Sequence, residues 1–314
     1  MSPPTIYDVA REAGVAASTV SRAFNNPNRV RGSTRDHILS VARRLGYRHN
    51  PHARALLSGR THAIGMVVSD ITNPHYFELI RGAEMRAKAS KYTLVLVNAE
   101  ESPRIEYDHI RRLGQSVDGF VLAASRLPDE NILEFAGMRP LVLMNRELPG
   151  LPSVIVDYAE GCHRIVDHLA SLGHESVVYL AGPRISWTAQ QRWKSIRNAC
   201  EKIGVEAVRI GYFIPTVASG VLAADAALHT DSTAVIAHND LLAIGVLRRL
   251  AERAVSVPAD MSVVGFDNIF ATDLCSPALT TLGGAHAEVG GEDVVESDDA
   301  HVGRNRDAPF GEPA

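Results

Sequence analysis

Residues 5–25 read TIYDVAREAGVAASTVSRAFN, and this stretch predicts two short amphipathic helices joined by a tight turn. Thr5 followed by Asp8 is typical of a capping box, in which each side chain accepts a hydrogen bond from the other residue's backbone amide. Gly14 is expected to end the first helix, because the residue after a helix often needs a left-handed backbone. The second helix is predicted over residues 17–25.

The two faces of this second helix differ in chemistry. Val20, Ala23 and Phe24 fall on the side expected to be buried. The opposite face has small, polar and cationic residues: Ser18, Ser21, Arg22 and Asn25. A helix of this kind can enter a DNA major groove and hydrogen-bond to base edges. The alternative is an ordinary helical hairpin with a solvated polar face.

Charge is distributed unevenly along the chain. Residues 1–60 contain ten Arg or Lys and three Asp or Glu, a net of +7; because the whole chain is −4, residues 61–314 carry −11. A basic head on an acidic body is typical of a DNA-binding protein, although a basic cluster can also be a solvated face. A third helix fits residues 34–45, with Ser33 or Thr34 as its cap.

The segment NPHARALLSGR follows at residues 50–60. Asn50 can cap a helix, and Pro51 suits the first helical position. Only about two turns fit before Gly59, so such a helix would be marginal unless it docks against something. Two interpretations stay open: a hinge helix that inserts leucine into the minor groove, and a plain interdomain linker.

The rest of the chain alternates apolar runs with helical patterns. Strand-like runs occur at 63–69, 93–98, 119–123, 141–145, 153–156, 176–181, 207–211, 234–237 and 262–265. Helical patterns lie at 76–90, 104–114, 159–172, 188–203, 218–229 and 240–253. Repeated strand–helix units imply an α/β fold with parallel sheets. The length suits two Rossmann-like subdomains, expected at residues 61–157 and 158–283.

Polar residues follow several of the predicted strands, where ligands bind in open parallel sheets. They are Asp70, Asn73, Tyr76, Asn145, Arg146, Asp157, Trp187, Arg192, Asn239, Asp240 and Asp267. Asp and Asn can bond vicinal hydroxyls, Arg can span two oxygens, and an aromatic ring can stack on a sugar. These residues predict a cleft for a polyol. For a single Asp a helix cap is the commoner role, which also fits Asp240, and Trp187 could belong to the core.

The chain resembles the lactose-repressor/galactose-repressor family of bacterial transcription regulators over residues 5 to about 283. The shared motifs are Tyr7-Asp8-Val9-Ala10, Gly14-Val15, Thr19-Val20-Ser21-Arg22, Asn50-Pro51, Leu172-Gly173-His174, His238-Asn239-Asp240, Val257-Pro258, Val264-Gly265-Phe266-Asp267 and Pro277-Ala278-Leu279-Thr280-Thr281. The resemblance implies a helix-turn-helix head at residues 1–48, a hinge helix or linker at 49–60, and a body like the periplasmic binding proteins. It also implies cleft roles for Arg192, Asn239 and Asp267.

By the same resemblance, Ala17, Ser18 and Arg22 read bases, and Ala53 and Leu56 contact the minor groove. The full set of expected DNA-binding residues is Thr5, Tyr7, Ala17, Ser18, Thr19, Ser21, Arg22, Asn25, Arg29, Asn50, Ala53 and Leu56. The expected effector-binding set is Asp70, Asn73, Tyr76, Arg146, Asp157, Trp187, Arg192, Asn239 and Asp267.

These residues together predict a transcriptional regulator, most often a repressor. We expect a homodimer on a near-palindromic operator, controlled by a small effector such as a sugar. The alternative is a sugar-binding transport protein, which would need a signal peptide and no DNA head. No phosphate loop, nucleophile–base pair or metal-ligand spacing is evident, so we expect no enzyme activity, cofactor or metal.

Cellular location follows from what the chain lacks. Cys162, Cys200 and Cys275 are scattered and predict buried or partly buried thiols in a reducing compartment. The N-terminus has no hydrophobic signal core, and no apolar run approaches the ~20 residues of a membrane helix. The expectation is a cytoplasmic protein with no membrane partner.

The C-terminal end differs from the family pattern. Residues 286–314 contain eight acidic and two basic residues, a net of −6, and few large apolar side chains. Such a segment cannot bury enough surface to offset its ordering entropy, so residues 284–314 are predicted to be a disordered acidic tail. The family continues here with a helix and further strands. A frameshift and a genuine truncation are both compatible with this difference.

Overall fold

The computed structural model describes residues 4–47, 60–270, 272–283 and 302–303. The chain divides after Thr61 into two compact units, a head and a body. The proposed hinge residues Asn50, Ala53 and Leu56 lie outside the described residues, as does the tail except for residues 302–303. Among the described residues, no helix is long and apolar enough to cross a membrane.

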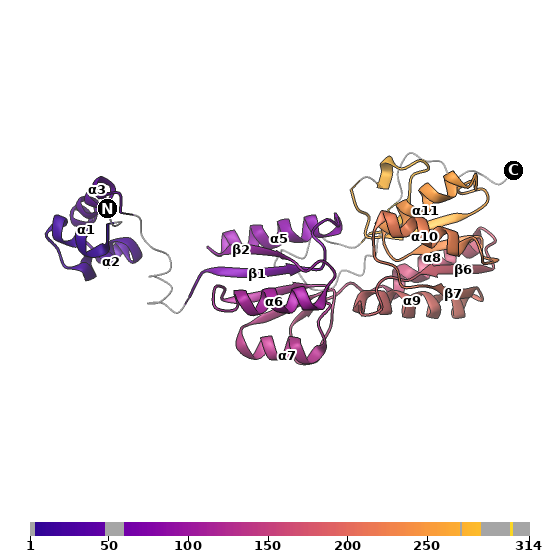
Figure 1. Cartoon of the computed structure of the whole chain (residues 1–314), viewed down its shortest axis with the longest axis horizontal. Helices are drawn as coiled ribbons and strands as arrows, with labels where there is room; N and C mark the ends of the chain where they lie inside the picture. The colour runs from indigo at the N-terminus through magenta and orange to yellow at the C-terminus, as the bar shows by residue number, and fades with distance from the viewer. Residues whose placement is uncertain (1–3, 48–59, 271, 284–301, 304–314) are drawn as a thin grey trace. The chain divides into compact units, whose positions relative to one another are not determined.

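The head is a three-helix unit (Figure 1). Its elements are α1 (Ile6–Ala13), α2 (Ala17–Asn25), the short 3-10 helix η1 (Pro27–Arg29) and α3 (Gly32–Leu45). The predicted capping box is confirmed, because the Thr5 amide donates to Asp8 Oδ2 at 2.9 Å and the Asp8 amide donates to Thr5 Oγ1 at 3.4 Å. Gly14 ends α1 with a φ of 65°, as expected. Val9, Val20 and Ile38, one from each α-helix, are fully buried in its core.

The predicted start of the third helix was wrong. The helix begins at Gly32, two residues earlier than expected, and its N-cap is Arg31. Ser33 and Thr34 therefore lie inside the first turn, and no side chain caps the helix. The carboxyl end follows the prediction, because Gly46 adopts a φ of 68° directly after Leu45.

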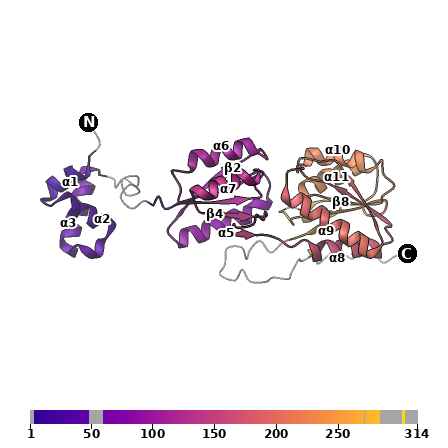
Figure 2. The ribbon, with the colours of Figure 1, turned by 90° about the horizontal axis from the view of Figure 1, so that it is seen from below.

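The first half of the body is a five-stranded parallel sheet in the order β2-β1-β3-β4-β5. The strands are β1 (Ala63–Val68), β2 (Thr93–Asn98), β3 (Gly119–Ala123), β4 (Leu141–Met144) and β5 (Ser153–Val154). The helices are α5 (His75–Ala89), α6 (Pro103–Leu113) and α7 (Asp129–Met138). In Figures 1 and 2, α5 covers one face of this sheet and α6 and α7 cover the other.

The second half of the body is a sheet in the order β11-β10-β9-β8-β6-β7, parallel except for β11. The strands are β6 (Ser176–Leu180), β7 (Glu206–Ile210), β8 (Ala234–Ala237), β9 (Ser262–Phe266), β10 (Thr280–Leu282) and β11 (Val302–Gly303). The helices are α8 (Ala159–Ser171), α9 (Trp187–Ile203), α10 (Val217–Ala227) and α11 (Asp240–Glu252), with a 3-10 turn η2 at Thr272–Leu274. The predicted α/β class with two parallel-sheet subdomains is confirmed.

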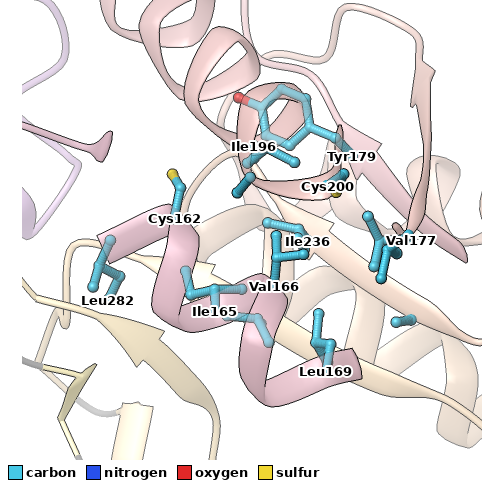
Figure 3. Packing of buried hydrophobic residues seen from close by; sticks show 14 of the residues in the cluster. Cys162, Ile165, Val166, Leu169, Val177, Tyr179, Ile196, Cys200, Ile236 and Leu282 are labelled. Carbon is cyan, nitrogen blue, oxygen red and sulfur yellow. The ribbon is translucent and has the colours of Figure 1, made fainter. Parts of the chain in front are cut away.

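Each face of the second sheet has its own hydrophobic core. Helices α8 and α9 pack on one face, where Tyr179, Ile236 and Cys162 are fully buried (Figure 3). Helices α10 and α11 pack on the other face. Cys200 is also buried and Cys275 is half-buried, as predicted for the thiols. Because both faces are covered, polar side chains can gather only at the ends of the strands.

Candidate functional site

Helix α2 presents a polar face to solvent in the head. Ser18 and Arg22 are exposed, whereas Ala17, Thr19 and Ser21 are half-buried. The N-cap of α2 is Ala16, which has no side-chain acceptor, so no side chain caps the first-turn amides. Uncapped amides at a helix N-terminus favour a phosphate there. The geometry therefore fits a helix that meets DNA with its amino-terminal turn.

Three arginine side chains of the head differ in whether an acid is paired with them. Arg11 forms an ion pair with Asp8. Arg22 and Arg29 are exposed, and neither guanidinium has an ion pair or hydrogen bond within the described part of the chain. Tyr7 is 73% exposed, which is unusual for an aromatic ring. Thr5 is exposed as well, and the side chain of Asn25 lies outside the described residues.

The body contains a polar cavity where the two sheets contribute residues from the carboxyl ends of their strands. Its lining is Asn73, His75, Tyr76, Glu101, Ala124, Arg126, Asn145, Ser186, Thr188, Arg192, Pro215, His238, Asn239 and Asp267. The free space is about 30 Å³, enough for only about two water molecules. A larger ligand therefore requires side chains or subdomains to move.

Four of the lining residues have a backbone conformation that L-amino acids rarely adopt. The φ angles are 56° at Glu101, 53° at Ala124, 52° at Asn145 and 102° at Asp267. These residues follow β2, β3, β4 and β9, so the backbone strain is concentrated at the carboxyl ends of the strands in both sheets. Positive φ at a non-glycine residue costs about 1–3 kcal/mol and persists where the surrounding structure enforces it, commonly at functional sites.

Arg192 and Asp267 form the central ion pair of the cavity. Arg192 Nη2 donates to Asp267 Oδ1 at 2.5 Å, and the two side chains are only 4% and 5% exposed. The guanidinium lies over the rings of both Tyr158 and Phe266, at 4.7 and 4.5 Å from their centroids. Burial alone would raise the pKa of Asp267, but the neighbouring guanidinium outweighs it and holds that pKa well below its usual range. Asp267 is therefore an anion at neutral pH.

Side chains of the two subdomains meet directly around this pair. His75 Nδ1 lies 3.6 Å from Asp267 Oδ1 across the cavity. Thr188 Oγ1 donates to the carbonyl oxygen of Asn145 at 3.1 Å, and the Asn145 side chain lies 3.4 Å from His75 Nε2. These contacts would have to change when a ligand enters.

A second ion pair, between Arg126 and Glu101, also lines the cavity. Arg126 Nε donates to Glu101 Oε2 at 2.7 Å, and Arg126 Nη2 donates to Glu101 Oε1 at 3.0 Å. Arg126 Nη1 donates to the carbonyl oxygen of Ala124 at 2.9 Å and to Ser186 Oγ at 3.2 Å. The amide of Arg126 also donates to the buried carboxyl of Glu106, whose pKa is raised by burial. This loop is thus fixed by both its backbone and its side chain.

The buried ring of His238 completes the polar lining. Tyr179 Oη lies 3.1 Å from His238 Nδ1. Burial, reinforced by the positive charge of Arg192, holds the pKa of His238 well below the ordinary imidazole value. His238 is therefore neutral at pH 7 and can act as a hydrogen-bond donor or acceptor.

Five residues of the predicted effector set line the cavity: Asn73, Tyr76, Arg192, Asn239 and Asp267. The other four lie elsewhere. Arg146 turns its guanidinium onto the carbonyl oxygens of Ser125 and Leu127 and onto Asp129. Asp157 is exposed and accepts a hydrogen bond from the Ala159 amide at 2.8 Å, at the start of α8.

Asp70 and Trp187 are the remaining two. Asp70 accepts hydrogen bonds from the amide and hydroxyl of Thr72 at 2.9 and 2.7 Å, so its carboxylate serves the local turn. Trp187 is half-buried as the first residue of α9 and is absent from the cavity lining. The local hydrogen bonds of Asp70, Arg146 and Asp157 explain why a position after a strand is not sufficient to reach the cavity.

The suggestion that Asp240 caps its own helix was wrong. Asn239 is the N-cap of α11, and its Oδ1 accepts from the Leu242 amide at 3.0 Å. Asp240 is fully buried and accepts from the Ile269 amide at 2.9 Å and from Thr281 Oγ1 at 2.6 Å. Asp240 therefore joins the start of α11 to the chain after β9 and to β10.

Several lining residues were not predicted: His75, Glu101, Ala124, Arg126, Ser186, Thr188, Pro215 and His238. For His238 a signal existed, because it directly follows the strand β8. Glu101 and Arg126 each lie three residues beyond a strand end, and their roles depend on pairing with each other. No local sequence pattern gives that pairing.

Comparison with known proteins agrees with this arrangement. The family model described as bacterial regulatory proteins, lacI family, matches residues 5–50, and a model of a periplasmic binding protein-like domain matches residues 166–307. The HTH-type transcriptional regulator DegA of Bacillus subtilis (strain 168) is 33% identical, with 92% of this chain and 88% of that protein covered. The HTH-type transcriptional repressor CytR of Escherichia coli (strain K12) is 32% identical, with 92% and 87% covered.

A solved structure is similar over both units. The lac repressor dimer bound to operator and the anti-inducer ONPF superimposes with a TM-score of 0.80 at 26% identity, covering 92% of this chain and 90% of that one. The two curated relatives are regulators rather than enzymes. Identity above 30% over most of both chains, together with the matched head, shows that this chain belongs to the lacI family of bacterial regulatory proteins.

Proposed function

We propose that the chain represses transcription by binding a near-palindromic operator as a homodimer, and that a small polar ligand in the body cavity controls this binding. The observation that carries the proposal is the combination, in one chain, of an exposed polar recognition helix with a strained, polar cavity at the strand ends. The protein acts by binding and not by catalysis.

In this proposal the first turns of α2 lie in the major groove. Ala17, Ser18 and Arg22 read bases. Ser18 and Arg22 are exposed, Ala17 is half-buried in the first turn of α2, and no acid among the described residues engages Arg22. The supporting contacts to DNA come from Thr5, Tyr7, Thr19, Ser21, Asn25 and Arg29. Asn50, Ala53 and Leu56 form the hinge that enters the minor groove.

The effector is a hydroxyl-bearing molecule, probed first with sugars. Asp267 Oδ2 accepts no hydrogen bond from the described residues, and Arg192 Nε is a buried donor without a partner. Asn73 and Asn239 offer further polar atoms. Because the present cavity has room for only about two water molecules, ligand binding must change the contact between His75 and Asp267. This change couples the ligand to the relative position of the two subdomains.

Selection of bound duplexes from a random DNA library, followed by fluorescence anisotropy, tests the DNA function. We expect a near-palindromic site whose affinity falls steeply with salt as phosphate contacts release counterions. A scrambled duplex of equal length is the control. Equal affinity for selected and scrambled duplexes at every salt concentration would contradict the proposal. A thermal-shift screen with sugars and nucleosides then identifies ligands, which are added to the anisotropy assay.

A further inference from the structure

We infer that the Glu101–Arg126 ion pair makes the cavity selective for an uncharged ligand, with Glu101 as the residue that excludes phosphorylated and carboxylated molecules. This inference rests on the proposed function of the cavity as the effector site. It concerns the charge of the ligand, which neither the fold nor family membership determines.

Glu101 and Arg126 form a bidentate ion pair. Two parallel N–H···O bonds of 2.7 and 3.0 Å join the guanidinium of Arg126 to the carboxylate of Glu101. The side chains are 4% and 15% exposed, so water screens the pair weakly. The same two-point arrangement is what an incoming phosphate or carboxylate would make with an arginine. Glu101 therefore occupies the position on Arg126 that an anionic ligand would need.

Two further donors of Arg126 are also engaged, and one is left. Its Nη1 donates to Ala124 and Ser186, so four of its five N–H groups are used within the described residues. The fifth N–H group, on Nη2, is the one left for a ligand. It can bond a neutral hydroxyl, but it gives an anion only a single contact. With four donors engaged, Arg126 cannot rotate toward a ligand without leaving Glu101 or Ala124 unpaired, which is costly in a buried site.

The other charges of the cavity are balanced in the same way. The guanidinium of Arg192 is matched by Asp267, and His75 lies against that same carboxylate. The pKa of His238 is lowered by burial, so this ring adds no positive charge at pH 7.5. Burial raises the pKa of Tyr76 above its ordinary value, so the phenol stays neutral. Both arginines of the cavity are therefore paired with an acid, and an anion finds neither guanidinium without its carboxylate.

Glu101 and its neighbour Glu100 differ in side-chain position and not in backbone conformation. The φ of Glu101 is 56°, and its side chain lines the cavity. Its neighbour Glu100 has a similar φ of 53°, but its side chain is exposed and makes no described ion pair. Glu100 therefore supplies a matched control.

The test compares the full-length wild type with the variants Glu101→Gln and Glu100→Gln at pH 7.5, above the ordinary pKa of imidazole. The probes are inorganic phosphate and sulfate, titrated against sodium chloride at constant ionic strength, and read by thermal shift and calorimetry. We expect no anion-specific effect on the wild type or on Glu100→Gln. Glu101→Gln should bind phosphate at least about tenfold more tightly than the wild type, because Arg126 is released. The double variant Glu101→Gln with Arg126→Gln should lose this gain.

The wild type alone can overturn the inference. Pairs of ribose with ribose 5-phosphate and of glucose with glucose 6-phosphate are compared on it; tighter binding of either phosphorylated member, or specific stabilisation by phosphate, refutes selection against anions. A folded Glu101→Gln variant, verified by circular dichroism, that gains no phosphate binding refutes the role of Glu101. If Glu101→Gln does not fold, the wild-type comparison decides. Operator binding is measured separately by fluorescence anisotropy. Absence of operator binding would contradict the proposed DNA function without changing the result of the phosphate titrations.

Discussion

Ser186 Oγ accepts a hydrogen bond of 3.2 Å from Arg126 Nη1, and these two residues belong to different halves of the body. Ser186 is fully buried and is also the N-cap of α9, because the same oxygen accepts from the Ala189 amide at 3.2 Å. One hydroxyl therefore both starts a helix and holds the guanidinium that pairs with Glu101. The bond to the Ala189 amide holds Ser186 Oγ in place, and this oxygen in turn orients the guanidinium of Arg126.

Ser186→Ala should lower the free energy of unfolding by about 1–3 kcal/mol, because it removes a helix cap and leaves a buried N–H of Arg126 without an acceptor. Urea denaturation followed by circular dichroism measures the loss. The control is Ser102→Ala, since Ser102 caps α6 through the Ile105 amide at 3.4 Å and makes no described bond to the other subdomain. We expect about 1 kcal/mol for the control. Equal losses would show that the contact with Arg126 contributes nothing to stability.

Close packing of α10 against α11 gives a second prediction. A Cβ added at Gly245 would lie 2.1 Å from the Val217 carbonyl oxygen and 2.7 Å from Gly220 Cα, so the helices must separate. Gly245→Ala should destabilise the body by about 3 kcal/mol or more, measured by urea denaturation. Gly137→Ala in α7 is the control, since no atom lies within 4 Å of its added Cβ. We expect the control to be neutral or stabilising by up to about 1 kcal/mol; similar destabilisation of both variants would reject the packing argument.

The order of most strands and helices could be predicted from the sequence. In these segments the apolar residues recur at the spacing typical of a helix or form the short runs typical of a buried strand. Several short elements were missed: the 3-10 turns η1 and η2, the helix α7 and the strands β10 and β11, the last of which lies in the segment predicted as a disordered tail. Two of them, α7 and β10, show why. Helix α7 has only ten residues and follows Pro128, so it provides few helical repeats, and β10 has only three residues. Both are specified by tertiary packing: Ile132 and Phe135 are buried against the first sheet, and β10 pairs with β9.

The cavity was predictable only in part. Asn239 and Asp267 directly follow strands, and parallel strands bring their carboxyl ends together, so these residues could be identified. Arg146 also lies close after a strand, yet the carbonyl oxygens of Ser125 and Leu127 capture its guanidinium. Side-chain direction after a strand depends on the local φ and on nearby acceptors. Glu101 could not be identified for the same reason, because only the folded chain brings it to its partner.

Asp240 provides a prediction for the pH dependence of stability. Burial, reinforced by the negative charge of Asp267, raises the pKa of Asp240 to about 8. In the unfolded chain this pKa returns to about 3.9. A folded-state pKa above the unfolded value contributes stability that is complete below the unfolded pKa and is lost as the pH rises through the folded pKa. Asp240 should therefore contribute a loss of stability on the order of a few kcal/mol between about pH 4 and pH 8, seen as the difference between the wild type and a variant that cannot ionise at this position.

Asp240→Asn should remove this slope, because the amide cannot ionise and can still bond the Ile269 amide and the Thr281 hydroxyl. Urea denaturation at several pH values compares it with the wild type. Asp231→Asn, at an exposed position without a described ion pair, is the control and should keep the wild-type slope. Parallel stability curves for Asp240→Asn and the wild type would mean that Asp240 does not titrate in this range.

Arg22 gives the sharpest test of how the head reads DNA. Its guanidinium is exposed on α2 and has no acidic partner within the described residues, so it is available to a base. Arg22→Ala should weaken binding to the selected operator by about 1–3 kcal/mol and leave binding to a scrambled duplex nearly unchanged. Fluorescence anisotropy at fixed salt measures both affinities.

The matched control for this prediction is Arg11→Ala, because Arg11 is also exposed but pairs with Asp8 on α1. We expect the control to change operator affinity less than Arg22→Ala does. If Arg22→Ala weakens operator and scrambled duplex equally, Arg22 contacts phosphate and carries no sequence information. In that case base reading would have to reside in Ala17 and Ser18, whose exchange should then alter the preferred operator sequence while the salt dependence of binding stays the same.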